Sequence, residues 1–393
     1  MSADPIVILA AQRTPMGAFQ GVLASATAPQ LGAAAIRGAI AASRVDPADV
    51  DEVVMGCVLP AGLGQAPARQ AMLAAGLRAS IPATTLNKMC GSAMRAVMSA
   101  ADQIAAGSAA IVVAGGLESM TNAPYLLPKA RAGYRMGHQE VLDHMFYDGL
   151  QSPWDGQLMG VFAEATAGKY GFGRAAQDAF ATESVRRAQA AVRDGVFAAE
   201  IAPVTTRTRA GESTIAVDET PHTLAIEKIP SLKPAFRKDG TVTAASSSGI
   251  ADGAAALVLS STAAAAARGL APIARIVGHA SFAREPEWFT LAPVGAIAKL
   301  LERIGWRADE VDLFEINEAF AVVTMAAMRD LGLDHAKVNV NGGACALGHP
   351  IGATGARILA TLLHALRARG KRRGIASLCI GGGEATAIAV EMA

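Results

Sequence analysis

Short runs of β-branched residues alternate along this chain with alanine-rich segments of helical period, and this alternation limits the folds open to it. The runs that favour strands are residues 6–9, 52–55, 110–113, 311–314 and 375–379. The segments that favour helices are residues 28–41, 92–106, 177–194, 294–304, 319–330 and 355–369. Alternation of this kind is typical of right-handed βαβ units. We therefore expect an α/β protein with a mostly parallel sheet.

The order of these segments repeats loosely in the two halves of the chain. In the first half, Cys90-Gly-Ser opens a helical segment, and the strand Ile111-Val-Val-Ala-Gly-Gly116 follows. In the second half, Gly352-Ala-Thr-Gly opens a helical segment, and Ile375-Ala-Ser-Leu-Cys-Ile-Gly-Gly382 follows. This similarity is too weak to establish a duplication by itself. Between residues 119 and 249 the pattern is irregular, with one clear helix after Tyr170, and so long an insertion is either structural or covers a binding site.

Length, charge and cysteine usage exclude several classes of protein. The 393 residues can form two or three domains and a large core. With 35 basic and 34 acidic side chains the net charge is +1, which gives no bulk attraction for nucleic acid or an anionic membrane. The four cysteines form no Cys-x-x-Cys pair, so we expect no metal site, and their small number fits a reducing compartment. The N-terminal Met-Ser-Ala-Asp-Pro lacks a secretion-signal pattern, and no apolar run reaches the ~20 residues that span a bilayer, so we expect a cytoplasmic protein.

Four short motifs carry side chains that are able to do chemistry. They are Asn87-Lys-Met-Cys90-Gly-Ser, Asn317-Glu-Ala-Phe-Ala321, Gly348-His-Pro-Ile-Gly352 and Cys379-Ile-Gly-Gly-Gly383. Together they offer two thiols, one imidazole and one amide, each in or beside small residues that leave room for a substrate. A nucleophile, a base and a second acid/base are the functions that such a set suggests.

The first thiol and the imidazole each have a functional and a structural interpretation. Cys90 precedes a strong helical pattern, and a helix N-terminus stabilises a thiolate, so we expect a nucleophile. The alternative is a buried, inert cysteine. His349 is flanked by Gly348 and Pro350, in a backbone that proline restrains, and could take the proton from Cys90. The alternative for His349 is a capping or core histidine.

The second thiol and the amide are open to the same two interpretations. Cys379 ends an apolar strand and meets three glycines, whose N–H groups can point at an oxyanion. It is either an acid/base that removes an α-proton from an acetyl group or a core residue at a strand end. Asn317 lies at a strand-to-helix turn, where it is either a helix cap or a residue that holds a water molecule.

The four motifs, in this order, resemble the thiolase family, and the resemblance runs nearly end to end. It is strongest in Val340-Asn-Gly-Gly-Ala-Cys-Ala-Leu-Gly-His-Pro-Ile-Gly-Ala-Thr-Gly-Ala-Arg357. The resemblance implies two similar α/β halves packed as five layers, α-β-α-β-α, with an inserted loop domain that binds coenzyme A. On this basis the N-terminal half comprises residues 1–118 and 250–271, the loop domain 119–249 and the C-terminal half 272–393.

The resemblance also implies a role for each site residue. Cys90 is the acylated nucleophile, His349 its base and Cys379 the second acid/base. One oxyanion hole uses the N–H groups of Cys90 and Gly381, and the other uses His349 and a water held by Asn317. The residues that the resemblance places against the substrate or its pantetheine arm are Leu158, Met159, Phe236, Ala244, Ser248, Ala319 and Phe320. Two positions depart from common family patterns, because Leu158 stands where acetyl-selective members usually have His, and Pro221 where an Arg often contacts the coenzyme nucleotide.

The implied reaction joins two acetyl-CoA molecules into acetoacetyl-CoA and CoA through an acetyl group on Cys90, and the reverse reaction cleaves a 3-ketoacyl-CoA. No metal or redox cofactor is needed, and the resemblance of residues 119–137 to a tetramer-forming region implies a homotetramer. The main alternative is a degradative 3-ketoacyl-CoA thiolase of broader chain length. A fatty-acid-type condensing synthase fits less well, because it uses two histidines where this chain has one histidine and Cys379. A Rossmann dehydrogenase lacks its glycine motif here, and a non-catalytic acyl-CoA-binding protein would not need these side chains.

Overall fold

The computed structural model describes residues 4–208 and 211–393, so the first three residues of the N-terminal segment considered above lie outside it. Its strands are β1 (Ile6–Arg13), β2 (Gly17–Ala18), β3 (Glu52–Gly56), β4 (Ala83–Leu86), β5 (Ile111–Ser119), β6 (Tyr125–Leu126), β7 (Leu142–Asp143), β8 (Val204–Thr208), β9 (Gly211–Ile215), β10 (Ala251–Ser261), β11 (Ala274–Ala283), β12 (Leu313–Ile316), β13 (Arg373–Ile380) and β14 (Glu384–Met392). Its α-helices are α1 (Ala28–Ser43), α2 (Pro67–Ala74), α3 (Ser92–Ala105), α4 (Met159–Tyr170), α5 (Arg174–Arg193), α6 (Thr220–Thr223), α7 (Thr262–Ala267), α8 (Ala292–Ile304), α9 (Ala321–Leu331), α10 (Ala344–Leu347) and α11 (Thr354–Ala368). Each expected strand and helix has a counterpart among them.

The central sheet is mixed, and the expectation of a mostly parallel sheet is wrong. Its strands follow the order β12-β13-β14-β11-β1-β10-β5-β3-β4, with β2 paired to β10. Only the pairs β12–β13, β3–β4 and β3–β5 are parallel. The physical reason lies in the connections, because a tight glycine turn joins β13 to β14 as a hairpin, and such a turn forces an antiparallel pair. Likewise β10 returns from the long insertion to run antiparallel to β5 and β1.

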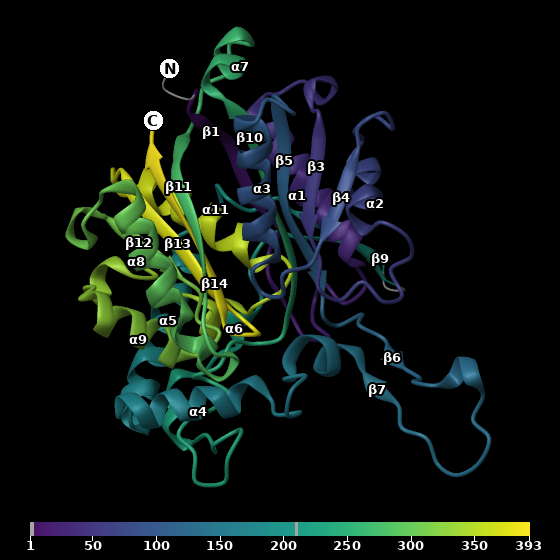
Figure 1. The fold of residues 1–393 in the computed structure, drawn as a ribbon, viewed down its shortest axis with the longest axis vertical. Helices are drawn as coiled ribbons and strands as arrows, with labels where there is room; N and C mark the ends of the chain where they lie inside the picture. Colours follow the sequence, from purple (N-terminus) through teal and green to yellow (C-terminus); the bar gives the residue numbers. More distant parts are fainter. Residues whose placement is uncertain (1–3, 209–210) are drawn as a thin grey trace.

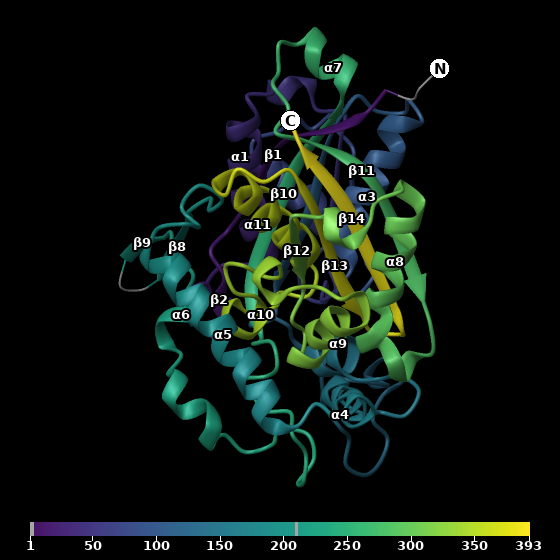
Figure 2. The ribbon, with the colours of Figure 1, turned by 90° about the vertical axis from the view of Figure 1, so that its left-hand side faces the viewer.

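The sheet divides into two halves at the contact between β1 and β11, where only two residue pairs join the strands. Helices α3 and α11 lie between the halves, in one apolar cluster with side chains from strands of both. Helices α1 and α2 cover the outer face of the N-terminal half, and α8 and α9 cover that of the C-terminal half. These are the five layers that the family resemblance implies, and Figures 1 and 2 show them from two sides.

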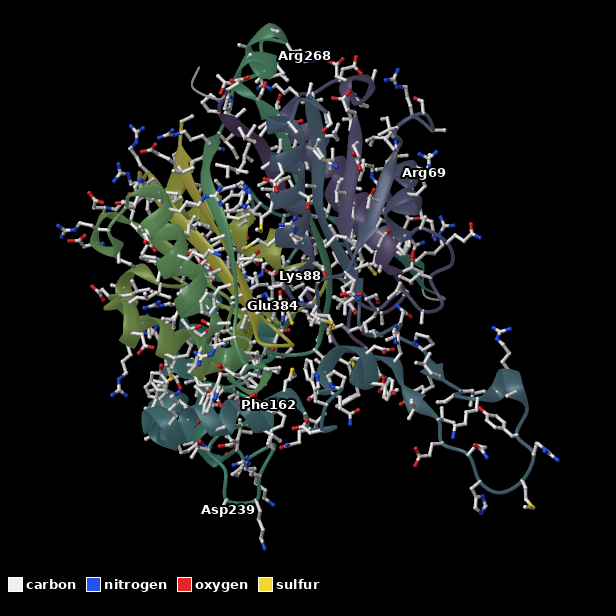
Figure 3. All side chains as sticks on the ribbon, viewed as in Figure 1. Arg69, Lys88, Phe162, Asp239, Arg268 and Glu384 are labelled. Carbon is white, nitrogen blue, oxygen red and sulfur yellow. The ribbon has the colours of Figure 1, made fainter. Side chains whose placement is uncertain are left out.

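Strand β10 shows why the sequence forms such layers. Ala255, Leu257 and Leu259 point into the central helical layer, whereas the alternating Ala254 and Val258 pack toward α1. Because both faces of this strand are covered, its sequence is a continuous apolar run and does not alternate between apolar and polar residues. The side chains of Lys88 and Glu384 come from different halves and lie beside each other where the halves meet (Figure 3).

The irregular segment leaves the sheet at the end of β5 and returns at the start of β10, where Ser119 is paired with Asp252. It contains the hairpin β6–β7, the pair β8–β9 and helices α4, α5 and α6. Figure 1 shows the β6–β7 hairpin extending away from the body of the molecule. Helix α4 was missed by the sequence analysis, which expected one clear helix here. None of the helices in the described part of the chain combines the length and apolar character that a membrane crossing requires.

Candidate active site

Cys90 occupies a tight turn between β4 and α3. The preceding residue, Met89, has a φ of 47°, a left-handed conformation that is unusual for a side chain of its size. The turn closes by a hydrogen bond of 3.0 Å from the Gly91 N–H to the Lys88 carbonyl. A Cβ at position 91 would lie 2.3 Å from Cδ1 of Ile380, so the Ile380 side chain, on the strand that carries Cys379, would have to move to admit any other residue. Cys90 as a residue is half-buried and lies two residues before the start of α3.

Cys90 is a thiol at neutral pH, which is the state that the expected transfer of its proton to His349 requires. Burial raises the pKa of Cys90 to about 11, although the N–H groups of Gly381 and of Cys90 itself lower it. The charge of Glu118 raises it further. Removal of the side chain from water therefore outweighs the favourable helix N-terminus. A nucleophilic Cys90 consequently needs a base to take its proton.

Cys379 lies at the end of β13, with 1% of its surface exposed. Burial raises its pKa well above the ordinary value, and ionisation of Cys90 would raise it further, which places the two thiols in one electrostatic environment. The turn that follows depends on glycine, because Gly382 and Gly383 have φ of 97° and 90°. Gly381 in the same turn directs its N–H toward the Cys90 thiol. One of the two expected oxyanion donors therefore lies against the nucleophile.

His349 is held in a loop before α11 that fixes both the backbone and the ring. Its N–H donates to the Gly249 carbonyl at 2.9 Å, and Nδ1 lies 2.6 Å from the Thr354 hydroxyl. That hydroxyl donates its only proton to the Pro350 carbonyl at 2.9 Å, so the proton of the first bond belongs to Nδ1 of His349. Nε2 is then left with a free lone pair, and it has no hydrogen-bond partner among the residues that the structure describes.

The electrostatics of His349 suit a base that is neutral at rest. Burial lowers its pKa to about 3, with a further contribution from the positive charge of Arg357. The imidazole is therefore uncharged throughout the neutral range, with Nε2 able to accept a proton. An unpaired ring nitrogen is uncommon in a buried histidine and is compatible with the predicted base, which stays a prediction.

Asn317 follows β12, and its backbone N–H donates to the Ser377 carbonyl at 3.0 Å. Both atoms of its side-chain amide are buried, and neither meets a hydrogen-bond partner in the described part of the protein. The neighbouring Glu318 fixes this loop, because its carboxylate accepts from Ser184 at 2.7 Å and from Asn339 at 2.8 Å. A buried amide with unused donors and acceptors is suited to hold a water molecule or a substrate oxygen.

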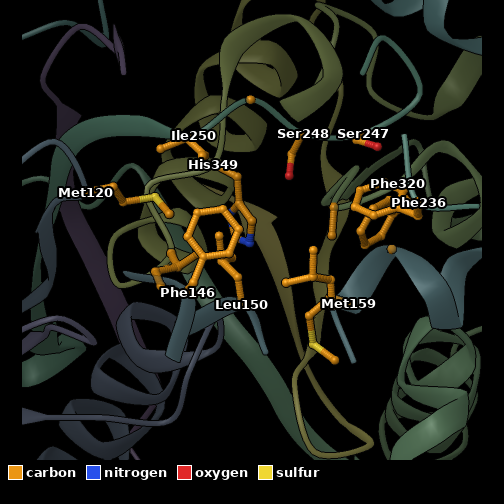
Figure 4. Close-up of a pocket in the computed structure, with 15 residues that line it drawn as sticks. Met120, Phe146, Leu150, Met159, Phe236, Ser247, Ser248, Ile250, Phe320 and His349 are labelled. Atoms are coloured by element: carbon orange, nitrogen blue, oxygen red, sulfur yellow. The ribbon is translucent and has the colours of Figure 1, made fainter. Parts of the chain in front are cut away.

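A cavity of about 190 Å³ connects these motifs (Figure 4). Its lining residues are Met120, Phe146, Leu150, Leu158, Met159, Gly160, Phe236, Ser247, Ser248, Gly249, Ile250, Ala319, Phe320, His349 and Ile351. Cys379 belongs to the apolar cluster that contains Met159 and Phe320, and Cys90 packs against the cluster of Met120 and Ile351. Each thiol therefore shares an apolar cluster with residues of the cavity wall, although neither cysteine nor Asn317 is in the lining, whereas His349 is.

Six of the seven expected binding residues line this cavity, but Ala244 does not. Ala244 is exposed on the surface of its loop. The rest of that loop is held against the start of α9, because the Ser248 N–H donates to the Ala319 carbonyl at 3.0 Å and the Ala321 N–H to Ser246 at 2.8 Å. Two residues expected to be helical therefore lie outside the helix, because Ala319 is in a bend, Phe320 is extended and α9 begins at Ala321. This extension turns Phe320 into the cavity wall.

A second cavity of about 240 Å³ lies beyond Met159. Met89, Trp154 and Gly381 are among its lining residues, so it reaches the backbone next to both catalytic turns. Met159 contributes to both cavities and separates them. Side-chain clusters suited to a metal ion, with at least three His, Cys, Asp or Glu, do not occur within residues 4–208 and 211–393.

Glu118 is a buried residue of the site that the sequence analysis missed. It accepts hydrogen bonds from the backbone N–H groups of Val58 at 2.9 Å, Leu59 at 3.2 Å and Gly352 at 2.8 Å. It thereby ties the loop after β3 to the loop that carries His349. Burial raises the pKa of Glu118 to about 7. The sequence feature that could have revealed this role is the position of the Glu118 carboxylate near the end of the apolar run that forms β5.

Comparison with known proteins agrees with this geometry. Residues 6–263 match the thiolase N-terminal domain and residues 270–392 the thiolase C-terminal domain. Acetyl-CoA acetyltransferases from Chromobacterium violaceum and Escherichia coli are each 50% identical to this chain, covering 98% of it and 99% and 98% of their own lengths. The crystal structure of the Bacillus anthracis acetyl-CoA acetyltransferase superposes with a TM-score of 0.97 at 42% identity, covering 100% of this chain and 99% of its own.

An Acat5 thiolase from Ascaris suum, solved in complex with coenzyme A, superposes with a TM-score of 0.94, also at 42% identity, and covers 99% of this chain and 100% of its own. Both family domains, the relatives and the solved structures span nearly the whole chain. The chain belongs to the thiolase family.

Proposed function

We propose that this protein is an acetyl-CoA acetyltransferase, which catalyses the reversible Claisen condensation of two acetyl-CoA molecules to acetoacetyl-CoA and CoA. The observation that carries the proposal is the identity of about half of all residues, over nearly the full length, with several acetyl-CoA acetyltransferases. A neutral imidazole in the cavity lining, two thiols in the apolar clusters beside it and a buried, unpaired amide in the loop that also supplies Ala319 and Phe320 to the lining support the same chemistry.

In the first step, Nε2 of His349 takes the proton of Cys90, and the thiolate attacks the carbonyl carbon of acetyl-CoA. Negative charge then develops on the carbonyl oxygen, where an oxyanion hole stabilises it. The C–S bond to coenzyme A breaks, Cys90 keeps the acetyl group, and the departing CoA thiolate takes a proton from Cys379. The raised pKa of Cys379 keeps the residue protonated at rest, so that it has a proton to give when the CoA thiolate departs.

In the second step, the Cys379 thiolate removes an α-proton from a second acetyl-CoA. A thiolate whose pKa is raised by burial is the stronger base, which matches it to a weakly acidic C–H group. The resulting enolate attacks the acetyl group on Cys90, and the C–S bond to Cys90 breaks. Acetoacetyl-CoA leaves, and Cys90 recovers its proton from His349. We propose that one oxyanion hole consists of the N–H groups of Cys90 and Gly381, and the other of His349 with a water on Asn317.

The proposed chemistry needs no metal or redox cofactor, because the thioester itself activates the acyl carbon and acidifies the α-carbon. The pantetheine arm would then run along the wall formed by Phe236, Ser248 and Phe320. Phe236 and Phe320 meet edge to face with ring centres 5.8 Å apart, which fixes this wall. A Cβ on Gly160 would lie 2.4 Å from the Phe236 ring, so α4 must begin with a glycine at this point.

We further propose a cytoplasmic homotetramer that acts in short-chain fatty acid metabolism. The β6–β7 hairpin supports the assembly, since Tyr125, Leu127, Met136 and Val141 are 68%, 57%, 92% and 56% exposed. An extended apolar hairpin of this kind is more stable when a partner covers it. All four cysteines are free, as suits a reducing compartment. Light scattering at assay concentration checks the assembly, and a monomer would contradict it.

One observation favours a second candidate, a degradative 3-ketoacyl-CoA thiolase of broader chain length. Leu158 gives the cavity wall an apolar side chain, and the second cavity beyond Met159 offers further space. Thiolysis rates for acetoacetyl-CoA and for longer 3-ketoacyl-CoA substrates decide between the two. A kcat/KM highest for acetoacetyl-CoA supports the acetyltransferase, and an increase with chain length supports the alternative. Absence of thiolysis with every substrate would contradict both.

A further inference from the structure

Lys88 and Glu384 form an ion pair that joins the two catalytic turns. Lys88 lies two residues before Cys90, and Glu384 lies three residues after Gly381, so 296 positions of sequence separate the partners. Figure 3 shows the two side chains meeting at the junction between the halves of the molecule. Neither residue has a role in the reaction described above.

The backbone of Lys88 is part of the turn that presents Cys90. Its N–H donates to the Ser92 hydroxyl at 2.8 Å, and its carbonyl accepts from the Gly91 N–H at 3.0 Å. The same hydroxyl donates to the Met89 carbonyl at 2.6 Å. Because these bonds enclose Cys90, a force on the Lys88 side chain is transmitted to the nucleophile.

The backbone of Glu384 is equally tied to the opposite turn. It is the first residue of β14 and is paired with Ile380 across the glycine turn that contains Gly381. The turns are already in close contact, since Ile380 fills the space that a side chain at Gly91 would need. A change in their separation therefore moves the Gly381 N–H relative to the Cys90 thiol.

We propose that the Lys88–Glu384 ion pair is a positioning tether, which sets the distance between the Gly381 N–H and Cys90 and so assembles the first oxyanion hole. The inference rests on the proposed function, because it assumes that this N–H group stabilises a reacting oxygen. The two side chains are 26% and 36% exposed, and pairs so exposed contribute little to folding stability. Their opposite charges also largely cancel at Cys90, so the pair acts through geometry.

The test breaks and rebuilds the pair. Lys88→Met and Glu384→Gln each remove one partner, and the double variant removes both. The charge swap, Lys88→Glu with Glu384→Lys, restores a pair of reversed polarity. We expect each single variant to lower kcat for acetoacetyl-CoA thiolysis about tenfold with little change in KM, because small displacements of a catalytic group are costly. The double variant should be no worse than either single one, and the swap should recover most of the rate.

A matched control is Arg268→Met, which breaks the Arg268–Asp49 pair at 35% and 42% exposure, away from the cavity. It should leave kcat unchanged. Additive losses in the double variant, or a swap that performs no better than the single variants, would overturn the tether. If Glu384→Gln fails to fold, Glu384→Asp carries the same test, because it keeps the charge and shortens the reach.

The pH dependence of Cys90 alkylation separates geometry from charge. If each charge acted alone on Cys90, removing Lys88 would raise the pKa of the thiol and removing Glu384 would lower it. Loss of the tether weakens the Gly381 contact in both variants, so we expect both to shift alkylation to higher pH. Shifts in opposite directions would overturn the inference. If Cys90 of the wild-type enzyme is alkylated normally but the enzyme shows no thiolysis, the result would instead contradict the proposed function.

Discussion

The two cysteine turns carry the same side chain in two different settings. Cys90 stands between a strand and a helix, partly exposed, after a residue with positive φ. Cys379 stands at the end of a strand that is covered on both faces, before a turn of glycines. Burial raises the pKa of both thiols, but the Gly381 N–H lowers that of Cys90, whereas ionisation of Cys90 would raise that of Cys379 further. The same chemical group is therefore easier to ionise in the first turn than in the second.

This difference teaches that the unequal electrostatics of the two thiols come partly from contacts between the halves of the molecule. The Gly381 N–H that favours ionisation of Cys90 belongs to the C-terminal half, and Cys90, whose ionisation would disfavour that of Cys379, belongs to the N-terminal half. Neither half on its own provides a complete site. The comparison makes distinct predictions for the two thiols.

The largest effect is expected for Cys90→Ala. Loss of the nucleophile should abolish the acetyl-enzyme and lower thiolysis by at least about 10⁴-fold, while slow exchange of acetyl α-hydrogens with solvent continues through Cys379. Labelled acetyl-CoA followed by peptide mapping measures the first result. Cys345→Ala, another buried thiol outside the cavity lining, is the control and should keep its label on Cys90. Label found on Cys379 of the wild type would exchange the proposed roles of the two thiols. Label found on Cys345 would show that Cys90 is not the nucleophile.

Cys379→Ala should have the next largest effect. The acetyl-enzyme should still form, more slowly, because Cys90, His349 and the N–H groups remain. Condensation and α-hydrogen exchange should fall by about 10²–10⁴-fold, the usual loss on removing a positioned acid/base. Deuterium uptake into acetyl-CoA, measured beside the yield of acetyl-enzyme, separates the two steps. Condensation at nearly the wild-type rate would show that the second thiol is only a core residue.

The pH dependence of alkylation should distinguish the thiols in the unliganded enzyme. Because the pKa of Cys90 is raised to about 11, its thiolate fraction should increase about tenfold per pH unit from pH 7 to 9. Iodoacetamide labelling of Cys90 should rise accordingly, and Cys379, whose pKa is raised well above its ordinary value, should react more slowly at every pH. Cys90→Ala and Cys379→Ala provide the controls, because each variant lacks one of the two thiols that are compared. A plateau for Cys90 below pH 8 would mean that the helix N-terminus outweighs burial.

The sequence predicted the elements and the chemical groups well, because both depend on local patterns. Strand and helix periods located the layers, and the motifs located the residues that gather at the cavity. Helix α4 was missed because Met159–Tyr170 has apolar residues on every side and two internal glycines, so no single face stands out. The predicted strand direction in the sheet was also wrong. The antiparallel pairs depend on where β10 and β14 re-enter the sheet, and no local sequence pattern records this.

The electrostatics of the site depend on contacts that are distant in sequence. The helix start at Cys90 was visible, but the burial that outweighs it depends on packing across the two halves. The tautomer of His349 follows from its bond to Thr354, and the direction of that bond is known only because the Thr354 hydroxyl donates to the Pro350 carbonyl. The role of Glu118 needed the loop of Gly352 to be folded beside it. The chemical groups of the candidate site could therefore be predicted from the sequence, whereas their ionisation states could not.

The smallest effect is expected for Leu158→His, which tests whether the cavity in front of the thiols sets chain length. Leu158 lines the cavity beside Met159, and a polar ring there makes the wall less favourable for an added apolar segment. One methylene in an apolar pocket changes discrimination by about 1–3 kcal/mol, or about 5–150-fold. Leu158→His alters one side of the wall only, so the ratio of long-chain to short-chain kcat/KM should fall about fivefold, at the lower end of that range. Leu73→His, at an exposed leucine on α2, should leave the ratio unchanged. If the ratio stays at the wild-type value in both variants, the acyl chain does not pass Leu158, and the space beyond Met159 becomes the better location for it.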